Sequence, residues 1–459
     1  MAELKKQPSS IGVADLEDEL QAGPLPSPVE VSNAARLGDA IELAKEESGP
    51  PLRSLFFNRD YMLLWSGQVI STLGSGMSGF VLPLLILAIT NSPAAAGFAG
   101  ALFFVPYVIF SLPVGALMDR WDRKRVMIIC DTVRAINIAT IPLALYFNGL
   151  TVWQLYVNSF IEGSCFVFFN IAETAALPRV VDKRQLPAAT AQNEAAFGIV
   201  GLISPAVGGF FYQSVSRVFP FIFDAISYSA SVIGLSLIRT RFQEERKAGE
   251  QRNLSTEIKE GLAWLWSHAL IRTIAFLTGG SNFVNASNGL IIILLAKRLG
   301  ANEGGIGLIF SVASVGGIVG AVLGGFIQKR FRFGQVIGGT IWVQAIMFPL
   351  LLLAPHPILI GVVAALMFMV SPIYNITQFS YRMALIPDRL QGRVNSSIRL
   401  IAWGSQPFGA AIGGVMLEQA GVEVTVAILS ACLFLAAIVA VTNHEIRHAK
   451  PIEQVQALA

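Results

Sequence analysis

Long apolar runs dominate the chain from residue 62 onward, and short polar breaks separate one run from the next. Each run has roughly the 20 apolar residues that an α-helix needs to cross the hydrocarbon core of a bilayer. The pattern therefore predicts an all-α integral membrane protein with twelve transmembrane helices. The predicted spans are 62–90, 95–118, 125–147, 152–177, 190–214, 219–239, 271–296, 304–328, 334–354, 357–382, 395–418 and 423–442.

Composition agrees with a membrane protein rather than a soluble one. Hydrophobic residues make up 54% of the chain and charged residues 14%, with a mean hydropathy of +0.61, whereas a soluble domain carries about 25% charged residues. The lipid bilayer is therefore an expected partner. The Lys and Arg residues gather between the apolar runs, which indicates orientation in a membrane and argues against binding to nucleic acid.

Basic residues are concentrated in alternate loops, beginning with the loop between the second and third spans. The opposite loops have few of them, and residues 91–96 and 148–151 have none. By the positive-inside rule, the basic loops and both termini are expected on the cytoplasmic side of the plasma (inner) membrane. Two termini on one side require an even number of spans, which agrees with twelve.

The longest of the predicted cytoplasmic connections separates two groups of six spans, and segment 204–209 has a looser counterpart at 406–414. Repeated halves are common in secondary transporters, whose substrate site lies between the repeats. We expect a monomeric protein with two six-helix bundles. Its predicted parts are a disordered cytoplasmic tail at 1–55, a bundle at 56–239, a cytoplasmic linker at 240–270, a second bundle at 271–443 and a cytoplasmic tail at 444–459.

The loop after the second span carries the most specific motif, Gly-Ala-Leu-Met-Asp-Arg-Trp-Asp-Arg-Lys-Arg at 115–125. It resembles the loop signature of the major facilitator superfamily, with matches at Gly115, Leu117, Asp119, Arg120, Arg123 and Lys124. Asp122 stands where much of the superfamily has Gly, and this departure resembles the branch of macrolide-efflux proteins and enterobactin exporters. Further positions are similar to that branch, namely 65–71, Asp131 with Arg134, 204–206, 224–227 and 390–394. The resemblance implies a two-bundle transporter that exports a macrolide-type antibiotic or a siderophore.

This loop is a candidate conformational latch. Gly115 permits two helices to approach closely, and the Asp119 carboxylate can accept hydrogen bonds at the N-terminus of a neighbouring helix. The expected partner is the start of the eleventh span at Ser396 and Ser397, so that the contact holds the halves together while the cavity faces outward. The alternative is that the basic residues serve only to enforce topology; they are Arg120, Arg123 and Lys124.

Ionisable residues within the spans are functional candidates, because a charge at the bilayer centre costs about 2.5–3.5 kcal/mol even on insertion scales. Glu162 lies nearest the midplane of any acid in the first half, with no basic residue within a helical turn in the sequence. It is the first candidate for proton coupling; the alternative is a neutral, hydrogen-bonded side chain. Asp224 is a second candidate, with helix packing or gating as its other interpretation. Asp131 and Arg134, three residues apart, are expected to form a structural pair, and Asp131 is a third coupling candidate.

Neutral polar residues also mark possible paths for a substrate. Asn282, Asn285 and Asn288 recur every three residues in the seventh span, where they either line a water-filled path or bond neighbouring helices. Gln68 and Asn170 are further candidates. The fifth span resembles the antiporter signature of the superfamily, with Ser204 where that pattern has Gly, and this favours export. The signature positions are Gly201, Pro205, Gly208 and Gly209.

The sequence argues against an enzyme. There is no phosphate-binding loop, and the four histidines lie at the ends of spans or outside them. The three cysteines lack metal-ligand spacing, so no metal or cofactor is expected. We expect a transporter that exports a hydrophobic or amphipathic small molecule, coupled to protons. The alternatives are a transporter of a polar metabolite and a non-transporting sensor with the same fold.

Overall fold

The computed structural model describes residues 54–118, 120–243 and 254–449. The predicted N-terminal tail lies outside these residues except for its last two positions. The predicted C-terminal tail is described only as far as Ala449, and it begins with the short helix α16, His444–Arg447. Every helix and turn of helix discussed below belongs to the described part of the chain.

Twelve helices in the described residues are long and apolar enough to cross a membrane, as the hydrophobic pattern predicts. They are α3 Arg59–Thr90, α4 Pro93–Met118, α5 Arg123–Tyr146, α6 Val152–Val180, α7 Leu186–Ser214, α8 Phe219–Leu237, α10 Ala269–Arg298, α11 Glu303–Arg330, α12 Phe333–Leu350, α13 Pro357–Leu385, α14 Asp388–Gln419 and α15 Gly421–Thr442. The largest boundary difference concerns α14, whose predicted start was residue 395. Its first turns are polar and follow Pro387, so apolarity alone does not reveal them.

The predicted linker contains a helix that hydropathy did not indicate, α9, Leu254–Ser267. Leu265 of α9 is fully buried, and Glu260 forms an ion pair with Arg393 of α14. Gly261 brings the two backbones together, because a Cβ at this position would overlap the Arg393 carbonyl group. The short elements η1 Leu55–Phe57, η2 Lys183–Gln185 and η3 Leu351–Leu353 complete the set.

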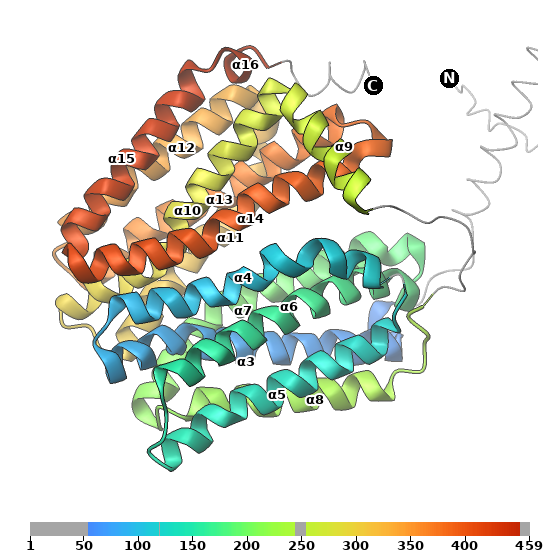
Figure 1. The fold of residues 1–459 in the computed structure, drawn as a ribbon, viewed down its shortest axis with the longest axis vertical. Helices are drawn as coiled ribbons and strands as arrows, with labels where there is room; N and C mark the ends of the chain where they lie inside the picture. Colours follow the sequence, from blue (N-terminus) through green and yellow to red (C-terminus); the bar gives the residue numbers. More distant parts are fainter. Residues whose placement is uncertain (1–53, 119, 244–253, 450–459) are drawn as a thin grey trace, which may run out of the picture. The chain divides into compact units, whose positions relative to one another are not determined.

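The membrane-length helices form two groups, which Figure 1 shows in the lower and the upper part of the view. In the first group α3 packs on α8, α4 on α6, and α5 on both α6 and α8. In the second group α11 packs on α13, α10 on α14, and α12 on α13 and α15. We refer to α3–α8 as the N bundle and to α10–α15 as the C bundle.

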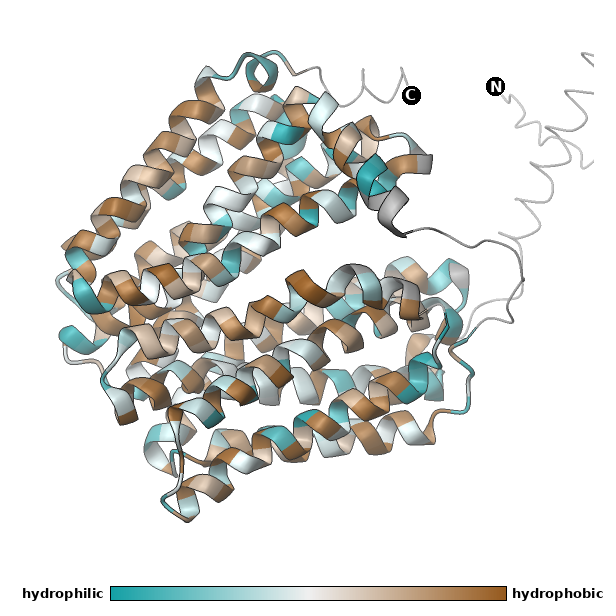
Figure 2. Ribbon diagram, viewed as in Figure 1, coloured by the Kyte–Doolittle hydropathy of each residue, from teal (hydrophilic) through white to brown (hydrophobic). Residues whose placement is uncertain are grey.

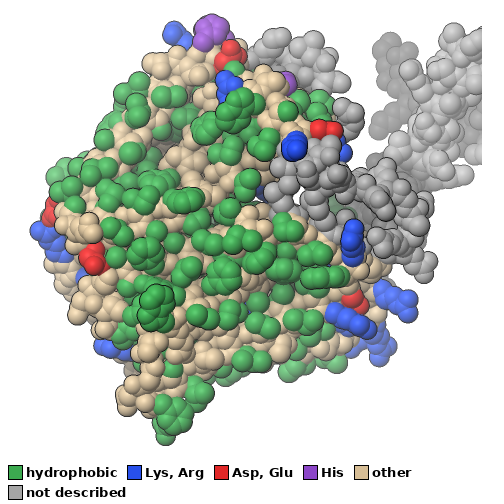
Figure 3. All heavy atoms as spheres, in the orientation of Figure 1, with side chains coloured by type: hydrophobic (Ala, Val, Ile, Leu, Met, Phe, Trp, Pro, Cys, Tyr) green, Lys and Arg blue, Asp and Glu red, His purple; other side chains and the backbone are tan. Residues whose placement is uncertain are grey.

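Apolar residues predominate along these helices, whereas polar residues are more frequent near the helix ends (Figure 2). The visible face in Figure 3 is largely green along the helices, with the Lys, Arg, Asp and Glu side chains toward their ends. Many large apolar side chains are exposed, among them Ile129, Ile136 and Phe326. A bilayer would cover this surface. A soluble protein rarely exposes so large an apolar area to water.

Most contacts between the bundles are made by two helix pairs, α4 with α14 and α7 with α11. The contacts are close enough to require glycine. A Cβ on Gly97 would lie 2.5 Å from the Ala410 carbonyl oxygen, and one on Gly209 would lie 2.5 Å from the Glu303 carbonyl oxygen. Gly307 likewise touches the Pro205 backbone. These glycines lie near the starts of α4 and α11 and the end of α7, a region that we call the sealed end.

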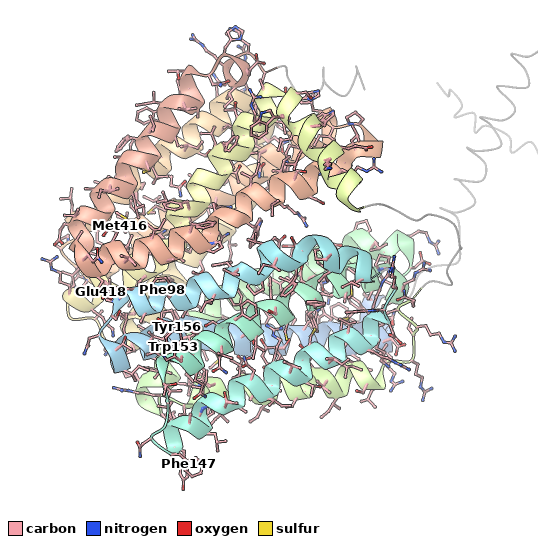
Figure 4. The ribbon with its side chains drawn as sticks, in the orientation of Figure 1. Phe98, Phe147, Trp153, Tyr156, Met416 and Glu418 are labelled. Carbon is pink, nitrogen blue, oxygen red and sulfur yellow. The ribbon has the colours of Figure 1, made fainter. Side chains whose placement is uncertain are left out.

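Two side chains of the sealed end cap helices of the opposite bundle. Glu418, in the last turn of α14, accepts a hydrogen bond from the Ala94 backbone N–H at 3.0 Å and another from Ser92 Oγ. Gln213, in the last turn of α7, accepts one from the Gly304 backbone N–H at 3.0 Å. Each side chain therefore satisfies a free N–H group at a helix N-terminus, where the dipole favours negative charge. Figure 4 shows Glu418 beside the start of α4, with Phe98 next to it.

Candidate functional site

The N bundle encloses a cavity of about 380 Å³, which we call the N cavity. Residues of α3, α4, α5, α6 and α8 line it, and most of its wall is apolar. Phe103, Phe104 and Phe166 supply aromatic side chains, and the first two form an edge-to-face pair with ring centroids 5.3 Å apart. The polar part of the wall includes Arg134 and Glu162.

Glu162 is not the isolated carboxyl group that the sequence indicated. Its Oε1 accepts hydrogen bonds from Arg134 Nε and from the Tyr228 hydroxyl group, both at 2.7 Å. The Arg134 guanidinium carbon also lies 4.2 Å from the centre of the Tyr228 ring. The expectation that Glu162 lacks a basic partner is therefore wrong. The reason is that Arg134 belongs to α5 and Glu162 to α6, so their proximity depends on helix packing.

The second carboxylate oxygen of Glu162, Oε2, distinguishes this site from an ion pair in which every polar atom has a hydrogen-bond partner. Oε2 is buried and makes no hydrogen bond to the described residues. Buried polar atoms in proteins almost always have a hydrogen-bond partner. An unsatisfied carboxylate oxygen on a residue that lines a cavity is therefore suited to a proton, a water molecule or a donor group of a ligand.

Asp131 is fully buried, and its Oδ1 lies 3.8 Å from Arg134 Nη1. The predicted pair is present, but the guanidinium group is closer to Glu162 than to Asp131. Two acids thus share one cation within the described residues of the N bundle. If both acids were ionised, the three side chains would carry one excess negative charge.

Asp224 on α8 is also fully buried, and it connects α8 to α3. It accepts hydrogen bonds from Ser78 Oγ and, at 3.4 Å, from Ser227 Oγ. Gly74 of α3 provides room, since a Cβ there would lie 2.8 Å from Asp224 Oδ1. Asp224 forms no ion pair with another described residue, and its contacts match those of a helix-packing residue.

The C bundle contains a second cavity, of about 390 Å³, which we call the C cavity. No Asp, Glu, Lys, Arg or His occurs among the described residues that line it. Amide and hydroxyl groups make up its polar wall. These residues are Thr278, Ser281, Asn282, Asn285, Asn288, Thr340, Gln344, Ser371, Tyr374 and Asn375.

The three predicted asparagines of α10 all line the C cavity, and two of them also bond neighbouring helices. Asn282 Nδ2 donates to the Ala402 carbonyl oxygen of α14 at 2.7 Å. Asn285 Oδ1 accepts from Gln344 Nε2 of α12 at 2.7 Å. The predicted bonds to neighbouring helices are therefore present for Asn282 and Asn285, and a water-filled path along these residues stays a prediction. By contrast, Gln68 and Asn170 line neither the N cavity nor the C cavity.

The loop motif has a structural role that the sequence did not reveal. Arg123 Nη1 donates to the Ala175 carbonyl oxygen of α6 at 2.8 Å, and Lys124 Nζ donates to the Ile238 carbonyl oxygen after α8 at 2.6 Å. Cations at helix C-termini stabilise the free carbonyl groups there. Asp122 caps the start of α5 by accepting from the Arg125 backbone N–H. The basic side chains thus tie the loop to its own bundle, while Arg120 is exposed.

The latch itself stays a prediction, because Asp119 lies outside the described residues. In this conformation no atom of the described chain lies within 4 Å of a Cβ built on Gly115, so the expected close approach is not present here. Among the antiporter-like positions of α7, Gly208 and Gly209 do admit close neighbours. Gly201 does not, although its carbonyl oxygen accepts a hydrogen bond from Ser314 at 3.2 Å.

Sequence reasoning missed Tyr228, Gln344, Glu418 and Gln213. Only Tyr228 had a usable signal, since it follows Asp224 by four residues and therefore lies on the same face of α8. A search of the described residues finds no cluster of His, Cys, Asp and Glu that could hold a metal ion.

The comparisons with known proteins come from sequence and from structure. Residues 50–458 match the family model described as transmembrane secretion effector. The chain is 25% identical over 394 residues to the multidrug efflux pump Tap of Mycolicibacterium fortuitum, covering 83% of this chain and 94% of that protein. It is 23% identical over 393 residues to macrolide efflux protein A of Streptococcus pyogenes, covering 84% and 96%.

Solved transporter structures share the fold at low sequence identity. A bacterial homologue of the lysosomal transporter Spinster superposes with a TM-score of 0.68 at 12% identity, over 84% of this chain and 96% of that one. A bacterial homologue of the iron transporter ferroportin gives a TM-score of 0.65 at 14% identity, over 84% and 98%. Both neighbours are bacterial homologues of transporters rather than enzymes, and they share the fold of this chain.

Proposed function

We propose that this chain, which belongs to the transmembrane secretion effector family of the major facilitator superfamily, exports a hydrophobic or amphipathic small molecule in exchange for protons. The observation that carries the proposal is the wall of the N cavity. Aromatic side chains there can bind an apolar body, and beside them two acids share one guanidinium group. Export is also favoured by the names of the similar proteins, which are a multidrug and a macrolide efflux protein.

The proton step follows from the charge of Asp131, Arg134 and Glu162. In the described arrangement Arg134 is bonded to Glu162, which leaves Asp131 buried at a longer distance from the cation. An ionised, poorly paired carboxylate at this depth is costly, so Asp131 holds a proton. When a donor group of the cargo or a second proton occupies Glu162 Oε2, Arg134 is free to pair with Asp131, and Asp131 then releases its proton. Asp224 is the second proton-coupling candidate that the sequence indicates.

The exchange requires alternating access, in which the binding site opens first to one side of the membrane and then to the other. The sealed end lies opposite the loop that carries Arg123 and Lys124, and the positive-inside rule assigns that loop to the cytoplasm. We therefore assign the sealed end to the outer face, both termini to the cytoplasm, and the described conformation to a cytoplasm-facing state. In the opposite state, the proposed latch at Asp119 holds the cytoplasmic ends together while the Glu418 and Gln213 caps are broken.

Reconstitution of the full chain in liposomes with an internal pH dye tests this function. An imposed proton gradient should drive uptake of a macrolide or of a hydrophobic cationic dye into inverted vesicles, and cargo should in turn move protons. Glu445→Gln is a matched control, because Glu445 lies on α16, outside both cavities. Cargo movement that persists when the gradient is collapsed would contradict proton coupling. Absence of any cargo movement would point to the sensor alternative.

A further inference from the structure

We infer that the C cavity binds an uncharged, hydroxyl-rich group of the cargo, of the kind that a sugar or a polyol presents. This inference rests on the proposed transport function, and it assigns to the C bundle a recognition role separate from the proton chemistry of the N bundle. Three observations carry it, namely the charge of the wall, the hydrogen-bonding groups that it offers, and its size.

The wall favours a neutral ligand. The described lining of the C cavity has amides, hydroxyls and apolar side chains but no ionisable acid or base other than the Tyr374 phenol. That phenol is already paired with Thr278 Oγ1 at 2.8 Å. A charged group that left water for this cavity would meet no opposite charge, and burial of an unpaired ion is far more costly than burial of a hydroxyl group that finds partners.

The hydrogen-bonding groups include atoms that the described protein leaves unsatisfied. Ser281 Oγ and Asn288 Oδ1 are buried without a partner among the described residues, and these side chains are only 9% and 5% exposed. Gln344 donates a hydrogen bond to Asn285 Oδ1, so the Asn285 Nδ2 group can donate its hydrogens to a ligand. The site thus offers donors and acceptors side by side. A hydroxyl group, which both donates and accepts, is complementary to such a pattern.

The volume fits a small organic group rather than a bare ion. About 390 Å³ lies within the roughly 300–1,000 Å³ typical of small-molecule sites. Apolar residues such as Met367 and Phe368 line the cavity beside the amides, so the wall suits a ring that carries hydroxyl groups. Ordered water is the competing occupant, since polar cavities of this size hold water when no ligand is bound.

Protection of a cysteine placed in the wall tests the inference. Gly289 lines the cavity, and a Cβ there meets only the Phe310 ring at 3.9 Å, so Gly289→Cys introduces a thiol without removal of a polar group. The background replaces the three native cysteines, Cys130, Cys165 and Cys432. The full chain is placed in lipid nanodiscs, and the rate of maleimide labelling is measured with four probes. The probes are octyl β-D-glucoside, octyltrimethylammonium, octyl sulfate and free glucose, all below micelle-forming concentrations.

Saturable protection by octyl glucoside, with much weaker protection by the cationic and anionic octyl compounds, is the expected result. The shared alkyl chain equalises partition into lipid, so the difference reports the headgroup. Protection by free glucose as well would support the hydroxyl-rich site and indicate a polar cargo. Equal protection by all three octyl compounds, protection by a charged headgroup alone, or no protection by any probe would overturn the inference.

Matched variants locate the binding groups. Asn285→Leu should raise the half-protecting concentration of octyl glucoside about tenfold, the loss expected for one or two hydrogen bonds. Thr273→Val is the control on the same helix, because the Thr273 hydroxyl bonds only the Ala269 carbonyl of its own helix. If Asn285→Leu fails to insert, Gln344→Leu serves instead, and unchanged protection in a folded variant of either kind would count against the site. Binding without any proton flux would leave this inference standing and contradict only the proposed coupling.

Discussion

The N cavity and the C cavity are nearly equal in volume, and both have hydroxyl and amide groups in their walls, yet only the N cavity adds an acidic and a basic side chain. Arg134 and Glu162 line the N cavity among aromatic side chains, and Asp131 is buried close to Arg134. The described wall of the C cavity offers amides and hydroxyls instead. Ionisable groups are costly at bilayer depth, and of the two cavities only the N cavity has acidic or basic side chains in its described wall. The other bundle can then recognise neutral groups in the same way at every stage of proton exchange.

The largest effect is expected from Arg134→Gln, which removes the cation that Asp131 and Glu162 share. Breaking a buried ion pair from one side costs about 3–5 kcal/mol, so we expect a strong loss of thermal stability and no detectable transport. The double variant Arg134→Gln with Glu162→Gln should recover much of the stability without transport. Thermal unfolding in detergent measures the first effect and cargo flux the second. A stable, active Arg134→Gln protein would show that the three side chains are not coupled.

Glu162→Gln should separate coupling from recognition. The amide keeps the shape of the side chain and cannot exchange a proton, so cargo binding at the C cavity should persist while proton-driven accumulation is lost. Asn285→Leu should do the reverse, with weaker binding and an unchanged ratio of protons to cargo. Measurement of probe protection and of proton flux on both variants tests whether coupling and recognition are divided between the bundles. The proposed division between the bundles is wrong if each variant impairs both readouts equally.

Asn285→Asp transfers a charge into the C cavity with almost no change in shape. The ionised carboxylate would lie in a wall without a compensating cation. Its Oδ1 can still accept the hydrogen bond from Gln344 as long as the side chain does not move. We expect about tenfold weaker binding of octyl glucoside at neutral pH, because the acid removes two donor hydrogens, and partial recovery at acidic pH as the carboxyl group takes up a proton. Binding that is weak and independent of pH would indicate a steric effect instead.

The sequence anticipated the helices better than it anticipated the site. Apolar length is a local property, so twelve spans were visible without any knowledge of packing. Asp131 and Arg134 were paired correctly because they lie on one helix face. The stronger contact of Arg134 with Glu162 joins α5 to α6, and nothing in the spacing of the two residues along the chain indicates it. Helix α9 was missed because its 14 residues are too few to cross a bilayer and include three charged side chains, so an apolar run of spanning length is absent.

The sealed end offers a second comparison between a charged and a neutral polar group, because one of its two helix caps is an acid and the other is an amide. Glu418 caps α4 and Gln213 caps α11, each with an N–H···O distance of 3.0 Å. An ionised acceptor interacts more strongly than an amide with the partial positive charge of a helix N-terminus. Glu418→Gln should therefore make the two caps alike, weaken the sealed end slightly and shift the resting population toward the outward-facing state.

The expected change is small because Glu418 is exposed and water screens its charge. The measurement is the labelling rate of a cysteine at Ala410, which in the described conformation contacts Gly97 and should become more accessible as the seal opens. Gln213→Glu is the complementary variant and should reduce the rate by strengthening the second cap. If the two substitutions shift the labelling rate in the same direction, the caps do not control the seal, and close packing at Gly97, Gly209 and Gly307 is sufficient to hold it.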